Sequence, residues 1–424
     1  MGDPLRLLGR RPSRARGPRG RLRRTARLLA MLAATPPVAL LLAAHTADPP
    51  EASSVPLPRA VLTVPTRPTT TDIRPMLSAA DAASSRGDTS RAWDLLHAAH
   101  ATDPSNAEAR VQLRALDRQP GFQLPVDDAS LASLRGLLGP QFREVRTEHF
   151  LLLSNAPNDW TIRRGQLLER ARHQFFRSLD RLGIPPVPHR HRLFAILFSS
   201  QEEYASFARR THGPSSTWVA AYYDGSLNAI VMFDDHDAPW NQTTTNERSS
   251  DARSSRASRP TPLARSVASA ADTTTLHEAA HLLAFNCGVQ VRGVDYPLWV
   301  SEGLATTFET DRPDLPFGPG RSASPRRGAI DANELDALAP LVEVIPARAA
   351  PEDPHKAAAF YARSWALFDT LAARRPRDLA AYLESLRNAP RGPIAPDAQR
   401  ALFEARFGPV EDVAKEIDRR LQKD

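Results

Sequence analysis

One short segment of the sequence has residue types and a spacing that can bind a metal ion. Residues 273–281, Thr-Thr-Thr-Leu-His-Glu-Ala-Ala-His, place two histidines four positions apart and enclose a glutamate. Side chains four positions apart lie on one face of a helix, so the imidazoles of His277 and His281 can converge on one ion. Glu278 lies on the flank of that face and can reach a water molecule on the metal without being a ligand itself.

The residues around this motif predict a buried helix. Leu276, Ala279, Ala280 and the run 282–285 are apolar and occupy nearly every side of it. Buried imidazoles need a metal ion or hydrogen-bond partners, because an unpaired polar group in a protein interior is costly. Gly288 marks the expected end of the helix.

A third candidate ligand follows on the next predicted helix. A catalytic zinc ion needs three protein ligands and an open fourth position. The segment 297–309, Pro-Leu-Trp-Val-Ser-Glu-Gly-Leu-Ala-Thr-Thr-Phe-Glu, predicts a helix that begins near its proline. Glu302 lies 21 residues after His281, and a connection of that length lets the second helix fold back beside the first. Its carboxylate can then complete a His, His, Glu set.

An HExxH motif followed by W-x-x-E-G-x-A at 299–305 resembles the gluzincin zinc metallopeptidases, in particular a peptidase-MA-like group of exported bacterial proteins of unknown function. The resemblance covers residues 142–421 and includes the segments 147–154 and 361–367. It implies that His277, His281 and Glu302 bind one Zn²⁺ ion. It also implies that Glu278 is the general base that activates a zinc-bound water to hydrolyse peptide bonds.

The resemblance implies two further roles in catalysis. Tyr361 would be a second donor to the developing oxyanion, and the strand 229–233 would be the edge strand along which an extended peptide lies. The alternatives are an ordinary packed aromatic residue and a plain sheet strand.

The sequence departs from the pattern of thermolysin-like relatives at one position. Those enzymes carry an Asp four residues after the ligand Glu, where it supports a ligand His, but this chain has Thr306 there. Glu309 can take over this supporting role, or it can be a solvated surface acid. The sequence leaves both possibilities open.

The elements that must position these residues alternate between strands and helices. Apolar runs predict strands at 149–154, 193–198 and 228–233, and amphipathic patterns predict helices at 160–182 and 201–210. The chain after the motif is expected to be mostly helical. We therefore expect an α+β fold, with a small mixed sheet followed by a zincin-like helical domain and preceded by a tetratricopeptide-like helical hairpin.

The expected organisation places several segments around the metallopeptidase-like domain, 140–424. Residues 73–118 resemble one tetratricopeptide repeat and the start of another, and the alternative is a simple helical hairpin packed on the next domain. A Pro-rich linker precedes them at 48–72. Residues 241–269 contain Ser, Thr, Arg and Asn with almost no apolar residues, so we expect a disordered insertion there.

The positive charge of the chain is concentrated at its N-terminus. Residues 1–27 hold ten Arg and one acid, whereas the remainder carries 45 basic and 47 acidic residues, so the body is not expected to bind nucleic acid. The apolar run 28–44 follows directly, and residues 1–47 therefore predict a signal peptide or an N-terminal membrane anchor. We expect an exported protein, periplasmic or extracellular. Cys287 is the only cysteine, which excludes internal disulfides and cysteine-rich metal sites.

Two functions of different classes follow from these features. The first is a zinc-dependent metallopeptidase that acts on a peptide or protein substrate. The second is a non-catalytic envelope scaffold with a structural zinc site and a protein-binding helical hairpin. The presence of Glu278 favours the first, because a purely structural site has no use for that carboxylate.

Overall fold

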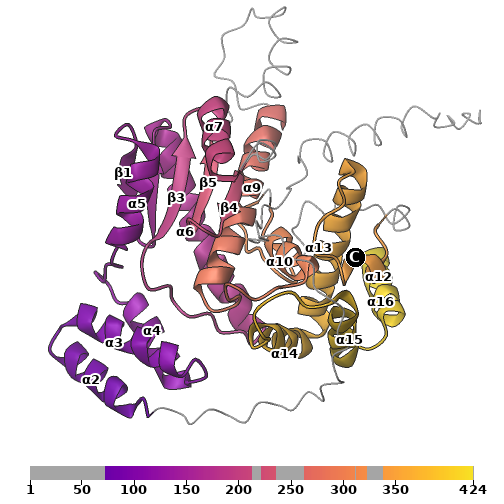
Figure 1. Ribbon diagram of the computed structural model, residues 1–424, viewed down its shortest axis with the longest axis horizontal. Coiled ribbons are helices and arrows are strands. Elements are labelled where there is room, and N and C mark those ends of the chain that lie inside the picture. The colour runs from indigo at the N-terminus through magenta and orange to yellow at the C-terminus, as the bar shows by residue number, and fades with distance from the viewer. Residues whose placement is uncertain (1–71, 213–220, 235–261, 311, 322–337, 424) are drawn as a thin grey trace, which may run out of the picture.

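The fold is seen in a computed structural model that describes residues 72–212, 221–234, 262–310, 312–321 and 338–423 (Figure 1). The predicted signal or anchor segment, 1–47, and nearly all of the predicted linker, 48–72, lie outside these ranges. Within the described ranges, no helix combines the length and the apolar character that a membrane span requires.

A five-stranded mixed sheet lies in the first half of the described chain. Its spatial order is β1-β2-β3-β5-β4; β2, β3 and β5 run parallel, and the two outer strands are antiparallel to their neighbours. The strands are β1 (Arg143–Arg146), β2 (Phe150–Ser154), β3 (Leu193–Phe198), β4 (Ala221–Asp224) and β5 (Ala229–Phe233).

The position of β5 corrects one expectation from the sequence. The segment 229–233 is an inner strand between β3 and β4, so it is not the edge strand along which a peptide could lie. That edge is formed by β4, a segment for which the sequence predicts no strand. The strand β4 is four residues long and contains two tyrosines and an aspartate, so its sequence lacks the apolar run by which the inner strands are predicted.

Helices cover both faces of the sheet (Figure 1). Alternate residues of a strand point to opposite faces of the sheet. Leu152 belongs to the core formed with α6 (Asn158–Arg181) and α9 (Pro262–Asn286). Leu153 belongs to the core on the other face, formed with α5 (Asp128–Leu138) and α7 (Gln201–His212). The inner strands are continuous apolar runs because both of their faces are buried.

The helix α9 begins inside the segment that we expected to be a disordered insertion, 241–269. It starts at Pro262, so the last eight residues of that segment are helical. Proline is well tolerated in the first turn of a helix, and the alanines that follow favour helix. Residues 241–261 lie outside the described part of the chain.

The second half of the chain is helical, so the α+β fold expected from the sequence is confirmed. The central helix, α10 (Leu298–Thr307), is buried along its whole length and packs against both α9 and α13. Trp299 of α10 stacks on Tyr382, with ring centroids 5.8 Å apart. The helices that surround it are α12 (Leu341–Val344), α13 (Pro354–Arg374), α14 (Pro376–Arg387), α15 (Pro396–Phe407) and α16 (Val410–Lys423).

The contact between α10 and α13 requires a glycine at position 303. A Cβ atom there would lie 2.7 Å from the Ser364 carbonyl oxygen and 2.8 Å from the Phe368 Cβ atom. Both distances are below van der Waals contact, so a side chain would push the two helices apart. Gly303 follows Glu302 directly. The close helix contact at Gly303 therefore helps to bury the candidate ligand Glu302.

The described chain begins with three helices that precede α5 and the sheet: α2 (Arg74–Ser85), α3 (Thr89–Thr102) and α4 (Ala107–Asp117). Asp88 and Asn106 cap the second and third of them by accepting hydrogen bonds from backbone N–H groups. Trp93 of α3 donates its indole N–H to the Arg190 carbonyl oxygen at 2.9 Å, which fastens these helices to the segment before β3.

Candidate metal centre

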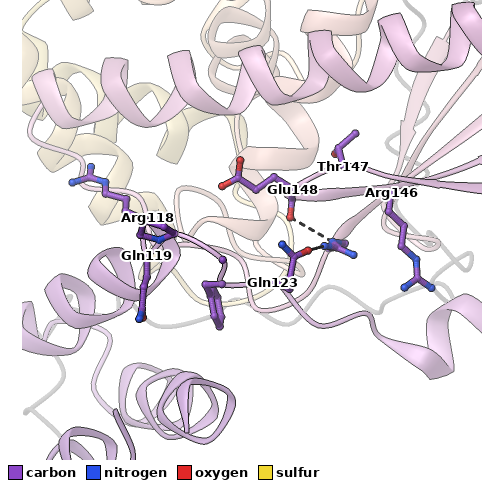
Figure 2. Close-up of a pocket in the computed structure, with 10 residues that line it drawn as sticks. Arg118, Gln119, Gln123, Arg146, Thr147 and Glu148 are labelled. Carbon is purple, nitrogen blue, oxygen red and sulfur yellow. Dashed lines mark hydrogen bonds between the residues drawn. The ribbon is translucent and has the colours of Figure 1, made fainter. Parts of the chain in front are cut away.

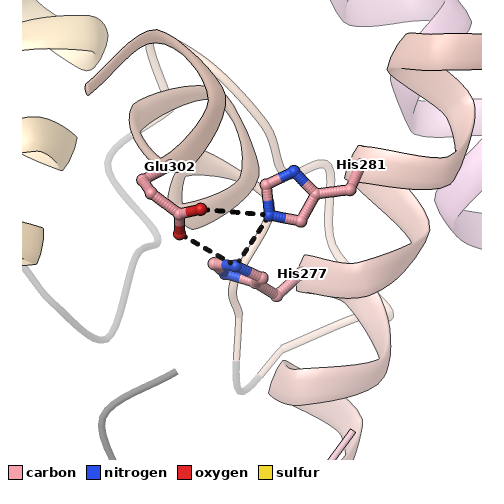
Figure 3. A group of neighbouring side chains, drawn as sticks. All are labelled: His277, His281 and Glu302. Carbon is pink, nitrogen blue, oxygen red and sulfur yellow. Dashed lines mark hydrogen bonds and ion pairs between the residues drawn. The ribbon is translucent and has the colours of Figure 1, made fainter. Parts of the chain in front are cut away.

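The two histidines of the HExxH motif project from one face of α9. Their rings meet edge to face with centroids 4.9 Å apart, and the two Nε2 atoms are 3.1 Å apart. Figure 3 shows both rings directed toward Glu302 on the neighbouring helix α10. The His277 and His281 side chains are almost fully buried.

The Glu302 carboxylate completes a compact set of three side chains. Its Oε2 atom lies 3.4 Å from His277 Nε2, and its Oε1 atom lies 3.5 Å from His281 Nε2. Nitrogen and oxygen ligands of a tetrahedral zinc ion, each about 2.0–2.1 Å from the metal, lie about 3.3 Å from one another. The structure thus brings the three predicted ligands together, close enough to one another to hold a metal ion.

The environment of Glu302 provides a separate test of whether a cation fits. The side chain is fully buried, and neither of its oxygens has a hydrogen-bond partner in the described part of the chain. A buried carboxylate is costly unless hydrogen bonds or an opposite charge compensate it. Glu278, also fully buried, lies beside it, so the negative charge of this region exceeds what two imidazoles can neutralise. A divalent cation fits this donor set and this charge.

Glu278 is held against the edge of the sheet. Its Oε2 atom accepts a hydrogen bond of 2.7 Å from the backbone N–H of Tyr223 in β4, and its Oε1 atom has no partner among the described residues. Burial raises the pKa of Glu278 to about 7; the neighbouring His277 opposes this shift and Glu302 adds to it. One carboxylate oxygen therefore fixes the side chain, and the other remains able to accept a proton.

Glu309 resolves an alternative that the sequence left open. It lies just beyond the end of α10, it is buried, and its Oε1 atom accepts a hydrogen bond of 2.9 Å from His277 Nδ1. Glu309 is therefore not a solvated surface acid. Thr306, which occupies the position of the supporting Asp in thermolysin-like enzymes, donates its hydroxyl to the Glu302 backbone carbonyl at 2.6 Å instead.

The imidazoles of His277 and His281 differ in pKa. Burial by itself lowers the pKa of both histidines. At His277 the Glu302 carboxylate 3.4 Å away and the hydrogen bond to Glu309 outweigh burial and raise the pKa to about 10, whereas His281 has a pKa well below its usual value. A metal ion that binds both Nε2 atoms must displace the proton held on His277.

Tyr361 lies on α13, the helix that packs against α10. Its side chain is buried, and its ring contacts the Phe360 ring edge to face. None of the distances that define the centre involves Tyr361, so its role as an oxyanion donor stays a prediction.

A second group of potential ligands, Glu148, His149 and Glu169, is an ion-pair network. His149 Nδ1 donates to Glu169 Oε2 at 2.7 Å, and its Nε2 lies 3.5 Å from an Asp117 oxygen. Burial opposes the protonation of His149, but these two carboxylates raise its pKa. Both ring nitrogens of His149 thus face carboxylates, and ion pairing accounts for the geometry of this group.

The candidate centre falls within a segment that matches a known family. A family described as "Protein of unknown function (DUF1570)" matches residues 271–394. This segment contains His277, Glu278, His281 and Glu302 together with the helices α10, α13 and α14. No match was found among curated proteins. The chain is thus similar, over its metal-centre region, to a family whose function is unknown.

Proposed function

We propose that the protein is a zinc-dependent metallopeptidase in which His277, His281 and Glu302 hold one zinc ion. The observation that carries this proposal is the contact of the two imidazole Nε2 atoms with each other at 3.1 Å and with the two oxygens of Glu302 at 3.4 and 3.5 Å, where that buried carboxylate has no hydrogen-bond partner in the described chain. The resemblance of the HExxH and W-x-x-E-G-x-A motifs to gluzincins agrees with it. We also expect the protein to be exported, as its N-terminal segment predicts.

A bound zinc ion would supply a Lewis acid that polarises the substrate carbonyl and makes a water molecule more acidic. Glu278 is the group that takes the proton from this water and returns it to the leaving amine. The Tyr223 N–H group holds one of its oxygens at 2.7 Å and leaves the other available. This arrangement orients the base without consuming its capacity to accept a proton.

The same hydrogen bond places the base beside the edge strand β4, whose outer edge pairs with no described strand. An extended peptide can bind to such an edge through backbone hydrogen bonds. A polypeptide that lies along β4 would pass next to Glu278. This position favours a peptide or protein substrate over a small amide.

The experiment that tests the proposal compares Glu278→Gln with a His277→Ala, His281→Ala double variant, after both have been reconstituted with zinc and desalted. We expect about one zinc ion in the wild type and in Glu278→Gln, and none in the double variant. Hydrolysis of casein or of a diverse peptide library should fall by about 10²–10⁴-fold in Glu278→Gln.

Two outcomes would contradict the proposal. Unchanged turnover in Glu278→Gln would exclude this residue as the base. A wild type that binds zinc and cleaves no peptide would instead indicate the structural zinc site of an envelope scaffold.

A further inference from the structure

A cavity of about 690 Å³ lies between the loop that follows α4 and the turn that joins β1 to β2. One wall is the loop that follows α4, with Arg118, Gln119 and Gln123, and the opposite wall is the turn between β1 and β2 (Figure 2). Arg192, just before β3, lies between these walls. The candidate metal centre contributes no residue to this cavity.

Arg192 is the buried cation in the lining of this cavity. It is 7% exposed, and no carboxylate lies within 4.0 Å of its guanidinium in the described part of the chain. Its Nη2 group donates to the Gln123 side-chain oxygen at 2.5 Å, and its Nε group donates to the Glu148 carbonyl at 3.4 Å. Both acceptors are neutral. Because buried charges are normally paired, an arginine in this state indicates a missing anion.

Two further arginines add to the positive charge of the lining. Arg118 is exposed and forms no ion pair within the described ranges, and Arg146 is exposed and pairs with Glu144 at 2.8 Å. Burial, together with the charge of Arg146, lowers the pKa of Arg192, and the charge of Glu169 opposes this shift. Glu148 is the acidic residue of the lining, against three arginines. The cavity therefore has an excess of positive charge.

We propose that this cavity binds a small molecule that carries a carboxylate or phosphate group, which the Arg192 guanidinium recognises. A guanidinium offers parallel N–H donors that match the oxygens of either group. Phe122 and Pro120 supply apolar surface for the body of the ligand, and Gln119 supplies an amide. The volume lies within the range of small-molecule sites.

The ligand would bind where two parts of the fold meet. Arg192 already joins Gln123, in the loop after α4, to Glu148, in the turn of the sheet. An anion on the same guanidinium would add a third contact at this junction. Binding should therefore stabilise the attachment of α2–α4 to the sheet.

The test uses the full chain and two probes, inorganic phosphate and succinate, titrated by calorimetry at low and constant ionic strength because salt screens such contacts. We expect at least one probe to bind, and Arg192→Gln to weaken it about tenfold or more. Arg190→Gln is the matched control: it removes the same charge two residues away, from an exposed arginine outside the cavity, and should leave binding unchanged. The probe that binds identifies phosphate or carboxylate as the recognised group.

Arg118→Gln keeps the test decisive if Arg192→Gln fails to fold, because Arg118 is exposed. This change should weaken binding about threefold. The proposal is overturned if neither probe binds, or if the variants at 118 and 192 bind as the Arg190→Gln control does. It is also overturned if binding disappears in the His277→Ala, His281→Ala double variant, since that result would place the anion at the metal centre.

Discussion

His277 Nδ1 donates a hydrogen bond to Glu309 Oε1 at 2.9 Å, so a carboxylate beyond the end of α10 fixes the ring of a candidate ligand on α9. This bond assigns the Nδ1 proton and turns Nε2 toward His281 and Glu302. A carboxylate that accepts a hydrogen bond from the other ring nitrogen raises the basicity of a ligand imidazole and holds its orientation. Glu309, which follows α10 in the chain, thus holds the orientation of a candidate ligand on α9.

Replacement of Glu309 by Ala should weaken zinc binding about 10–100-fold, because the His277 ring loses the partner that orients it. Competition with a fluorescent zinc chelator would measure the change in Kd. Thr306→Val is the matched control inside the same region, since that hydroxyl bonds to the Glu302 backbone carbonyl and contacts no imidazole nitrogen. Equal zinc affinity in the wild type and in Glu309→Ala would show that Glu309 has no such role.

Gly303→Ala should destabilise the fold. The added methyl group would meet the Ser364 carbonyl oxygen and Phe368 Cβ, and overpacking of this kind costs about 1–3 kcal/mol. Gly136→Ala is the control, because position 136 is also helical but has no atom within 4 Å of a new Cβ. There the gain in helix propensity should stabilise the protein by up to about 1 kcal/mol. Urea unfolding of both variants would measure the difference, and equal effects would contradict the close helix contact.

The stability contribution of His149 should depend on pH. Its pKa in the folded protein is raised, so the contribution is complete below the unfolded pKa of about 6.5 and is lost as the pH rises through the folded value. His149→Gln should therefore lower the free energy of unfolding more at about pH 5.5 than at about pH 9. Denaturant titrations at both pH values would measure this. The exposed His173→Gln is the control, and a pH-independent loss for His149→Gln would contradict the ion-pair network.

Zinc should stabilise the folded protein, because the ligand set exists only when α9 and α10 are packed together. At a free zinc concentration one hundred times the Kd, the gain is about 2.7 kcal/mol, which raises the unfolding midpoint by several degrees. Addition of a chelator should reverse the shift. The same zinc-induced shift in the His277→Ala, His281→Ala double variant would mean that the metal binds elsewhere.

Much of the sheet and the core of the candidate centre could be predicted from the sequence. The strand 193–198 agrees with β3 at both ends, because a strand buried on both faces is an unbroken apolar run. The four-residue spacing of His277 and His281 requires a common helix face, and the connection to Glu302 is long enough for α10 to return beside α9.

The parts that could not be predicted depend on tertiary contacts without a local signal. The partner of Glu278 is a backbone N–H group, which every residue except proline carries, so nothing in the sequence marks Tyr223 for this role. The direction of the Glu309 side chain is set by where α10 ends against α9. The edge strand β4 is too short for a periodic pattern, so the sequence alone points to the inner strand β5 as the edge.

The close contact of α10 with α13 has a consequence for biosynthesis. The three candidate ligands and Glu309 all belong to the stretch 277–309, whereas α13 begins only at Pro354. A ribosome therefore releases the complete ligand set before it releases the helix that covers α10. Closure of the short loop between α9 and α10 costs little entropy. The order of chain growth thus completes the set of candidate ligands before the packing that buries them can form.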